Sequence, residues 1–241
     1  MRNQRISRGL LSVVALASAA LSAQNPAPTD HLTELRLRIV SSQAGKHRIV
    51  PAVAWLEPVA GTHALPFPSA RHYTLLQKNR SFIPHLQVVP VGAVVQFPNA
   101  DPFYHNVFSL YGGKRFDLGL YEAGSSKSVT FSRVGVSYIF CDIHPEMSAV
   151  VLVLATPLYA VADDRDTFSI QQAPPGDYNL HLWVEGVPQP ILDGLTHLVH
   201  LQEPKVDLGT INVSVTPGTM GTHQDKFGNP YDPHSKSPYQ P

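Results

Sequence analysis

Proline spacing is the feature that most limits what this chain can fold into. The 241 residues contain 22 prolines and 16 glycines, spread along nearly the whole sequence. A proline inside a helix removes a backbone hydrogen bond and clashes with the preceding turn, so closely spaced prolines disfavour long helices. The segments between them are short apolar runs of strand length, without a sustained helical period. The sequence therefore predicts an all-β fold.

The apolar runs fall into two groups along the chain. Residues 32–40 and 49–56 are strand-like, and the runs then follow closely up to residue 155. Expected strands in this part are 73–77, 86–97, 105–110, 128–131, 137–140 and 148–155. The last is apolar almost without interruption, as expected for a strand buried on both faces. We expect residues 31–155 to form one Greek-key sandwich.

A second, smaller β unit is expected over residues 156–215. Pro157 interrupts the chain just after the apolar run, and new turn signals follow it. Residues 167–170, 178–184 and 206–215 are its expected strands. Residues 216–241 are rich in Pro, Gly, Ser and His, which predicts a disordered tail.

The first 23 residues have the pattern of a cleaved export signal. Arg2, Arg5 and Arg8 precede an apolar stretch, and small residues end near Ala23, although cleavage after residue 19 or 20 would also fit. The apolar stretch is too short to span a bilayer comfortably. We therefore expect a periplasmic or secreted protein with no membrane span, and a flexible lead-in over residues 24–30.

Net charge argues against a nucleic-acid partner. The chain has 18 basic and 18 acidic residues, and loss of the three signal arginines would leave 15 basic residues and a net charge of −3. A nucleic-acid-binding face needs clustered basic residues. No such cluster stands out in the sequence.

The chemistry of the chain centres on its single cysteine. Cys141 precedes His144 and Met147 on one short loop between two apolar runs, and His105 begins an earlier strand. Each residue alone has an ordinary interpretation, such as a small buried thiol or a core methionine. A cysteine nucleophile with a histidine base is a weaker interpretation, since no third group is evident to orient the histidine. The combined set predicts a metal site.

Copper fits this set of donors better than zinc does. Soft sulfur suits Cu(I), imidazole suits both oxidation states, and a His₂Cys plane with a weak axial Met is typical of electron-transfer copper sites. Zinc would more often recruit further thiolates, imidazoles or a carboxylate. The remaining histidines are scattered, and we expect most of them at the surface.

The loop Cys141-Asp-Ile-His144-Pro-Glu-Met147 resembles that of the short-loop cupredoxins, the plastocyanin- and amicyanin-like type 1 copper proteins. The histidine followed by Asn106 and the Gly-x-x-Val-x-Phe-x-Asn run at 92–99 are also similar, so the resemblance covers roughly residues 84–155. It implies a cupredoxin sandwich with one type 1 copper. It also implies that His105, Cys141, His144 and Met147 are the ligands, with Asn106 tying the two ligand loops together.

Residues 168–170, 173–180 and Trp183 resemble carboxypeptidase regulatory-like or transthyretin-like β domains. That resemblance implies no peptidase activity, and no His-Glu-x-x-His run is present. The sequence as a whole predicts an electron carrier, not an enzyme, that works with a redox partner protein of unknown identity. We expect the edge of His144 to face solvent within an apolar docking patch of Pro102, Phe103 and Pro145. The alternatives are a copper carrier or chaperone, and a surface interaction protein whose second β unit binds glycan or peptide.

Overall fold

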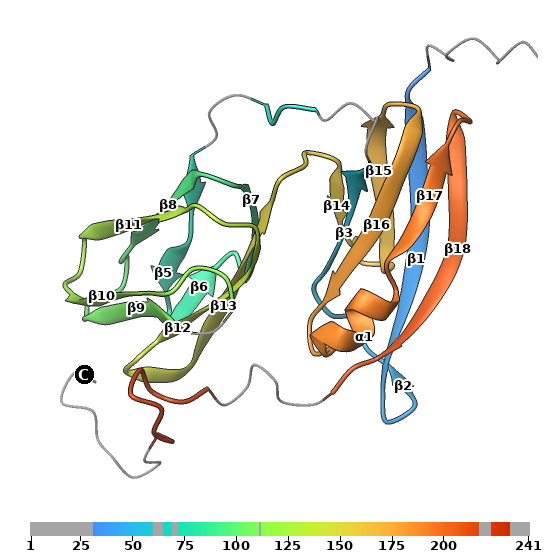
Figure 1. The fold of residues 1–241 in the computed structure, drawn as a ribbon. Helices are drawn as coiled ribbons and strands as arrows, with labels where there is room; N and C mark the ends of the chain where they lie inside the picture. The colour runs from blue at the N-terminus through green and yellow to red at the C-terminus, as the bar shows by residue number, and fades with distance from the viewer. Residues whose placement is uncertain (1–30, 60–64, 69–71, 111, 217–222, 232–241) are drawn as a thin grey trace, which may run out of the picture.

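The computed structural model describes residues 31–59, 65–68, 72–110, 112–216 and 223–231 (Figure 1). The expected export signal and lead-in lie outside these residues. Apart from one short helix, the regular secondary structure of the described part consists of strands, so the prediction of an all-β fold is confirmed. The elements are β1 (Thr33–Gln43), β2 (Lys46–His47), β3 (Ala52–Pro58), β4 (Tyr73–Thr74), β5 (Leu76–Lys78), β6 (Ser81–Ile83), β7 (Leu86–Pro90), β8 (Ala93–Pro98), β9 (His105–Ser109), β10 (Phe116–Tyr121), β11 (Ser126–Phe131), β12 (Gly135–Cys141), β13 (His144–Leu154), β14 (Tyr159–Val161), β15 (Thr167–Ala173), β16 (Gly176–Val184), α1 (Gln189–Gly194), β17 (His197–Leu201) and β18 (Lys205–Ser214).

One group of strands, β4 to β13, is continuous in sequence, and we call it the inserted unit (residues 73–154). Its larger sheet has the order β10-β9-β12-β13-β7, and β11-β8-β4 and β5-β6 form two smaller sheets. β7 lies parallel to β13, whereas β9, β12 and β13 pair antiparallel. The core of the unit contains Phe97, Phe131 and Ile139, together with Cys141 and Met147.

The remaining strands, β1 to β3 and β14 to β18, form what we call the host unit (residues 33–58 and 159–214). One sheet has the order β15-β1-β18, with β2 on β1, and the other has the order β14-β3-β16-β17. β1 and β18 run parallel, so the first and last described strands of the chain are neighbours. Along the chain, the inserted unit therefore lies between the two parts of the host unit. In space, the two units lie side by side (Figure 1).

This arrangement differs from the expected division at residue 155. β1 and β3 were expected in the same sandwich as β9, β12 and β13, but β1 pairs with β15 and β18, and β3 pairs with β14 and β16. The burial of β1 alternates along most of its length, with Leu35, Leu37 and Ile39 inside. That alternation shows which face is buried but not which sheet buries it, because the choice of partner depends on contacts far away in sequence.

β13 belongs to the cores of both units. Four of its side chains pack into the core of the inserted unit, namely Met147, Ala149, Val151 and Val153. The alternating three pack into the core of the host unit, namely Val150, Leu152 and Leu154. The expectation that this strand is buried on both faces is confirmed, and the second face is the junction between the units.

An ion pair also links the two units. His85 Nε2 lies 3.0 Å from Glu185 Oε1, and His85 Nδ1 lies 3.2 Å from the carbonyl oxygen of Ser148. His85 immediately precedes β7, and Glu185 immediately follows β16. The junction therefore combines apolar packing with a polar contact.

Residues 223–231 return to the inserted unit beside β12 and β13, and we call them the C-terminal strap (Figure 1). This differs from the expectation of a disordered tail over 216–241, because the strap makes specific contacts with Cys141 and Asp142. Residues 217–222 and 232–241 lie outside the described residues. In the described part of the chain, α1 has only 6 residues, and no helix could cross a membrane.

Candidate metal centre

Sheet pairing brings three of the predicted ligands together. His105 begins β9, Cys141 ends β12 and His144 begins β13, and these three strands are neighbours in one sheet. The Nδ1 atoms of His105 and His144 lie 3.7 and 3.5 Å from Cys141 Sγ. The three donor atoms all lie within 4.8 Å of one another, and all three residues are buried.

The spacing of these donors fits a single metal ion. Metal–nitrogen and metal–sulfur bonds of about 2.05 and 2.3 Å, meeting at about 120° in a trigonal plane, would separate nitrogen and sulfur by about 3.8 Å. The two observed separations are close to that value. Both imidazoles turn the same ring nitrogen towards the sulfur, so the three donors converge on a common point.

The surroundings of Cys141 favour a bound cation over a free thiolate. Burial raises the pKa of the Cys141 thiol to about 11, although backbone N–H groups of Asn106, Ile143 and His144 partly offset this rise. Without a metal, the side chain would therefore be a neutral thiol at neutral pH. The same N–H groups face the sulfur and would stabilise its negative charge once a metal displaces the proton.

His105 is oriented by a carboxylate that the sequence analysis did not identify. Its Nε2–H donates to Asp101 Oδ2 at 2.8 Å, which leaves the Nδ1 lone pair facing the sulfur. The Asp101 carboxylate also accepts the backbone N–H groups of Asn79 and Arg80, at 2.6 and 2.9 Å. Burial lowers the pKa of His105, so the ring is neutral and able to bind a metal. An acid four residues before a predicted ligand was the signal available in the sequence.

His144 differs from its expected role at the surface. Its side chain is only 5% exposed, and among the described residues its Nε2 has no hydrogen-bond partner. The Phe103 ring packs over both imidazoles, with ring centroids 5.2 Å from His105 and 5.7 Å from His144. Burial, together with electrostatic interactions with His105 and Arg80, lowers the pKa of His144 to about 4. The expected patch is thus only partly present: Pro102 and Pro145 are exposed, while Phe103 is half-buried and covers the histidine.

Met147 lies in the same buried cluster as Cys141. It is 1% exposed and follows His144 along β13. This position is compatible with the predicted axial ligand, and its bond to a metal stays a prediction.

Asn106 contacts the ligand loop through its backbone and not through its side chain. Its Nδ2 donates to Asp117 Oδ1 at 2.7 Å, while its Oδ1 is buried with no hydrogen-bond partner in the described part of the chain. The expected tie between the two ligand loops instead includes a residue of the C-terminal strap. Lys226 Nζ donates to Asp117 Oδ2 at 3.0 Å, and the Lys226 backbone N–H donates to Asp142 Oδ1 at 2.9 Å.

Two further contacts hold the C-terminal strap against the ligand loop. The Tyr231 hydroxyl donates to the carbonyl oxygen of Cys141 at 3.1 Å. The His223 ring stacks on Phe140, with centroids 4.2 Å apart and ring planes inclined by 28°. The strap therefore covers the outer side of the strand that ends at the candidate sulfur ligand.

Comparison with known proteins gives limited similarity. No family model matches the chain, and no curated protein matches it. The copper-containing nitrite reductase of Thermus scotoductus SA-01 is 28% identical over 41% of this chain and 25% of that chain, with a TM-score of 0.34, so the match spans about a quarter of that enzyme. A purple cupredoxin from Nitrosopumilus maritimus is 25% identical over 34% of this chain and 96% of that chain, with a TM-score of 0.31. A point mutant of amicyanin in its reduced Cu(I) form is 21% identical over 42% of this chain and 98% of that chain, with a TM-score of 0.33.

Proposed function

We propose that this chain is an exported type 1 copper protein that transfers electrons. In this proposal His105, Cys141 and His144 bind one copper ion, and Met147 is a weak axial ligand. The observation that carries the proposal is the convergence of two imidazole nitrogens on one buried cysteine sulfur, at 3.5 and 3.7 Å. A His₂Cys plane of this kind is the characteristic donor set of electron-transfer copper sites.

Each surrounding residue has a role that suits electron transfer. Copper would supply a one-electron couple between Cu(I) and Cu(II). Asp101 holds His105 in the tautomer that presents Nδ1, and Phe103 keeps water away from both imidazoles. The ligands are fixed to three paired strands, which restrains them from moving between oxidation states. A site that reorganises little exchanges electrons quickly.

We assign electron carriage in preference to catalysis because His105, Cys141 and His144 are all buried. Such a centre leaves little room for a substrate to reach the metal. Pro145 directly follows His144, Pro102 lies three residues before His105, and both prolines are exposed. A redox partner protein would dock at this surface. The basic and apolar pattern of residues 1–23 supports export to the periplasm or outside the cell.

The decisive experiment is the absorption spectrum of the purified, Cu(II)-loaded chain. We expect an intense visible band from charge transfer between the Cys141 thiolate and Cu(II). Electron exchange with a small one-electron mediator should then be fast, while copper should leave only slowly to a chelator. A colourless Cu(II) complex would contradict the proposed centre, and slow exchange with rapid release would favour a copper carrier.

Met147→Leu tests the axial ligand separately. The band should persist, because the trigonal donors remain, and the reduction potential should rise, because a weaker donor set stabilises Cu(II) less. Voltammetry of the variant beside the parent chain measures the change. An unchanged potential would mean that Met147 is only a core residue.

A further inference from the structure

A cleft of about 880 Å³ lies at the junction between the two units, away from the three candidate donors. One wall comes from the inserted unit and includes Tyr138 and Leu152, and the other comes from the host unit and includes Trp55 and Trp183. We infer that this cleft binds a small organic anion that carries a flat aromatic ring. The inference does not rest on the copper site.

The host-unit wall offers a fixed aromatic surface. The Trp55 ring stacks on His181, with centroids 5.2 Å apart and planes inclined by 14°. His181 Nε2 also lies 3.0 Å from Glu57 Oε2, and His181 Nδ1 lies 3.2 Å from Thr196 Oγ1. The imidazole stacks on one face of the indole, and both rings line the cleft. A half-buried indole supported in this way suits a planar ligand, because stacked aromatic pairs gain energy beyond their buried area.

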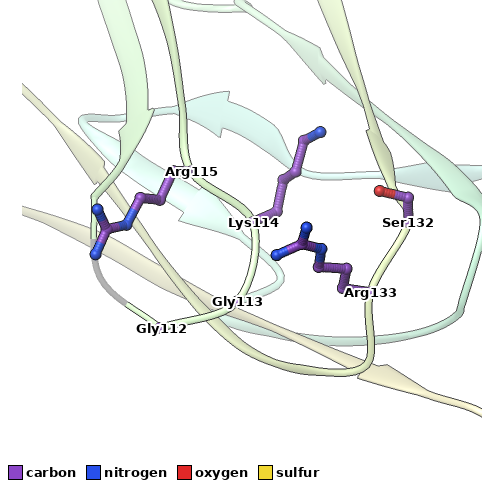
Figure 2. Close-up of a pocket in the computed structure, with 6 residues that line it drawn as sticks. All are labelled: Gly112, Gly113, Lys114, Arg115, Ser132 and Arg133. Atoms are coloured by element: carbon purple, nitrogen blue, oxygen red, sulfur yellow. The ribbon is translucent and has the colours of Figure 1, made fainter.

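Basic side chains lie at the mouth of the same cleft. Arg133 lines both the cleft and an adjoining hollow of about 580 Å³, which Lys114 and Arg115 also line. Figure 2 shows the Lys114 and Arg133 side chains in the space between the loop at 112–115 and the loop at 132–133, whereas the Arg115 side chain points away from this space. Glu57, which lies close to His181, is the only acidic residue among those that line the two hollows. This edge of the cleft is therefore suited to a negative charge.

Close backbone packing fixes the basic loop in place. The Gly113 N–H donates to the carbonyl oxygen of Val136 at 2.6 Å, and the Lys114 N–H donates to Ser137 Oγ at 2.8 Å. Gly112 has a φ of 75°, and a Cβ there would come within 2.5 Å of the same Val136 oxygen. Only glycine allows residue 112 to come this close to the Val136 carbonyl. The contact packs the loop at 112–115 against β12 and keeps Lys114 on the side of Arg133.

Size and chemistry together define the class of ligand. The volume lies in the range of pockets that bury small organic molecules. A simple inorganic anion would leave the aromatic wall unused, and a neutral ring would leave the basic edge unused. A carboxylate on an aromatic ring uses both, since the planar guanidinium of Arg133 matches a carboxylate with two parallel hydrogen bonds.

The test uses naphthalene-2-carboxylate and its neutral relative naphthalen-2-ylmethanol with the full, copper-loaded chain. Isothermal calorimetry should show saturable binding of the acid at one site, with affinity about tenfold above that of the alcohol, equivalent to about 1.4 kcal/mol. Both tryptophans of the chain line the cleft, so their emission in the reduced protein should change with the same affinity. No binding of the acid at millimolar concentration, or equal affinities for acid and alcohol, would overturn the inference.

Matched variants locate the site. Arg133→Gln should weaken binding of the acid about five- to tenfold, as expected for loss of a charge-assisted contact, and leave binding of the alcohol unchanged. Arg115→Gln removes the same charge from a neighbouring side chain that points away from Lys114 and Arg133, and it should change the affinity of neither ligand. Trp55→Ala should weaken binding of both ligands. An equal effect of the two arginine variants would mean that the acid responds only to overall charge, which contradicts the assignment. An unaltered visible spectrum in each variant shows that the fold is intact.

Discussion

Histidine–carboxylate pairs occur in both units, and they show how burial changes the meaning of one contact. In the host unit, His200 pairs with Asp177 at 2.7 Å, and the two side chains are 60% and 49% exposed. In the inserted unit, His105 pairs with Asp101 at 2.8 Å, but His105 is fully buried and its other nitrogen faces a thiol. Exposed pairs of this kind contribute little to stability, whereas the buried pair fixes the orientation of the His105 ring, with Nδ1 towards the Cys141 sulfur.

Cys141→Ser should have the largest effect on this comparison. A hydroxyl is not a soft donor, so we expect complete loss of the intense visible band and of tight copper binding. His200→Gln, which removes a histidine from an exposed pair in the host unit, should leave both unchanged. Visible absorption and copper titration measure both variants. A variant without Cys141 that kept the band would place the metal elsewhere.

Leu152→Ala tests whether the two units depend on each other through β13. Leu152 is buried in the core of the host unit, although its strand carries His144. We expect a loss of about 2–4 kcal/mol in the free energy of unfolding, as for other buried leucines, with the visible band retained. Denaturant titration measures the loss. Leu198→Ala at an exposed position of β17 is the control, with an expected change of less than about 0.5 kcal/mol.

Asp101→Asn sharpens the distinction between the buried and exposed pairs. Loss of the carboxylate should weaken copper binding about ten- to a hundredfold, because the amide no longer fixes the His105 tautomer as strongly. Asp177→Asn makes the same change in the exposed pair and should leave copper affinity as it is. Competition with a chelator of known affinity measures both. Equal effects of the two variants would contradict an orienting role for Asp101.

Tyr231→Phe tests whether the C-terminal strap contributes to the inserted unit. Loss of the hydrogen bond to the Cys141 carbonyl should lower the free energy of unfolding by about 1 kcal/mol and speed copper release. The conservative change Phe227→Leu alters an exposed ring in the same segment and serves as the control. Stopped-flow transfer of copper to a chelator follows the release. Identical release rates in both variants and the parent would mean that the strap does not retain the metal.

The junction should show a small dependence on pH. The hydrogen bond with Glu185 raises the pKa of His85 above its usual value of 6.5, although burial opposes the rise. The protonated pair therefore adds stability that is fully present below pH 6.5 and is lost as pH rises through the raised pKa. Because the His85 side chain is 39% exposed, we expect only a few tenths of a kcal/mol. His85→Gln should remove this difference when unfolding is compared at about pH 5.5 and about pH 8.5. A parent chain with no such difference would show that the pair does not stabilise the junction.

The sequence predicted local features well and long-range pairing poorly. The spacing of Cys141 and His144 and the uninterrupted apolar run of β13 are local, and the structure has them as expected. The strand partners of β1 and β3 depend on residues more than a hundred positions away, and alternation alone does not specify them. The sequence also did not predict which side chains pack together. The burial of His144 beside Phe103 depends on tertiary packing, which the spacing of residues along the chain does not reveal.

The parallel pairing of β1 with β18 has a consequence for the order in which the molecule forms. All the strands of the inserted unit come from one continuous segment, so this unit can fold while later residues are still being synthesised. The host unit must wait for residues 205–214 to return to residues 34–42, which is a slow step because a long loop has to close first. The C-terminal strap comes later still in the chain. We therefore expect the three candidate donors to assemble early, so that copper can enter before the strap covers the ligand loop.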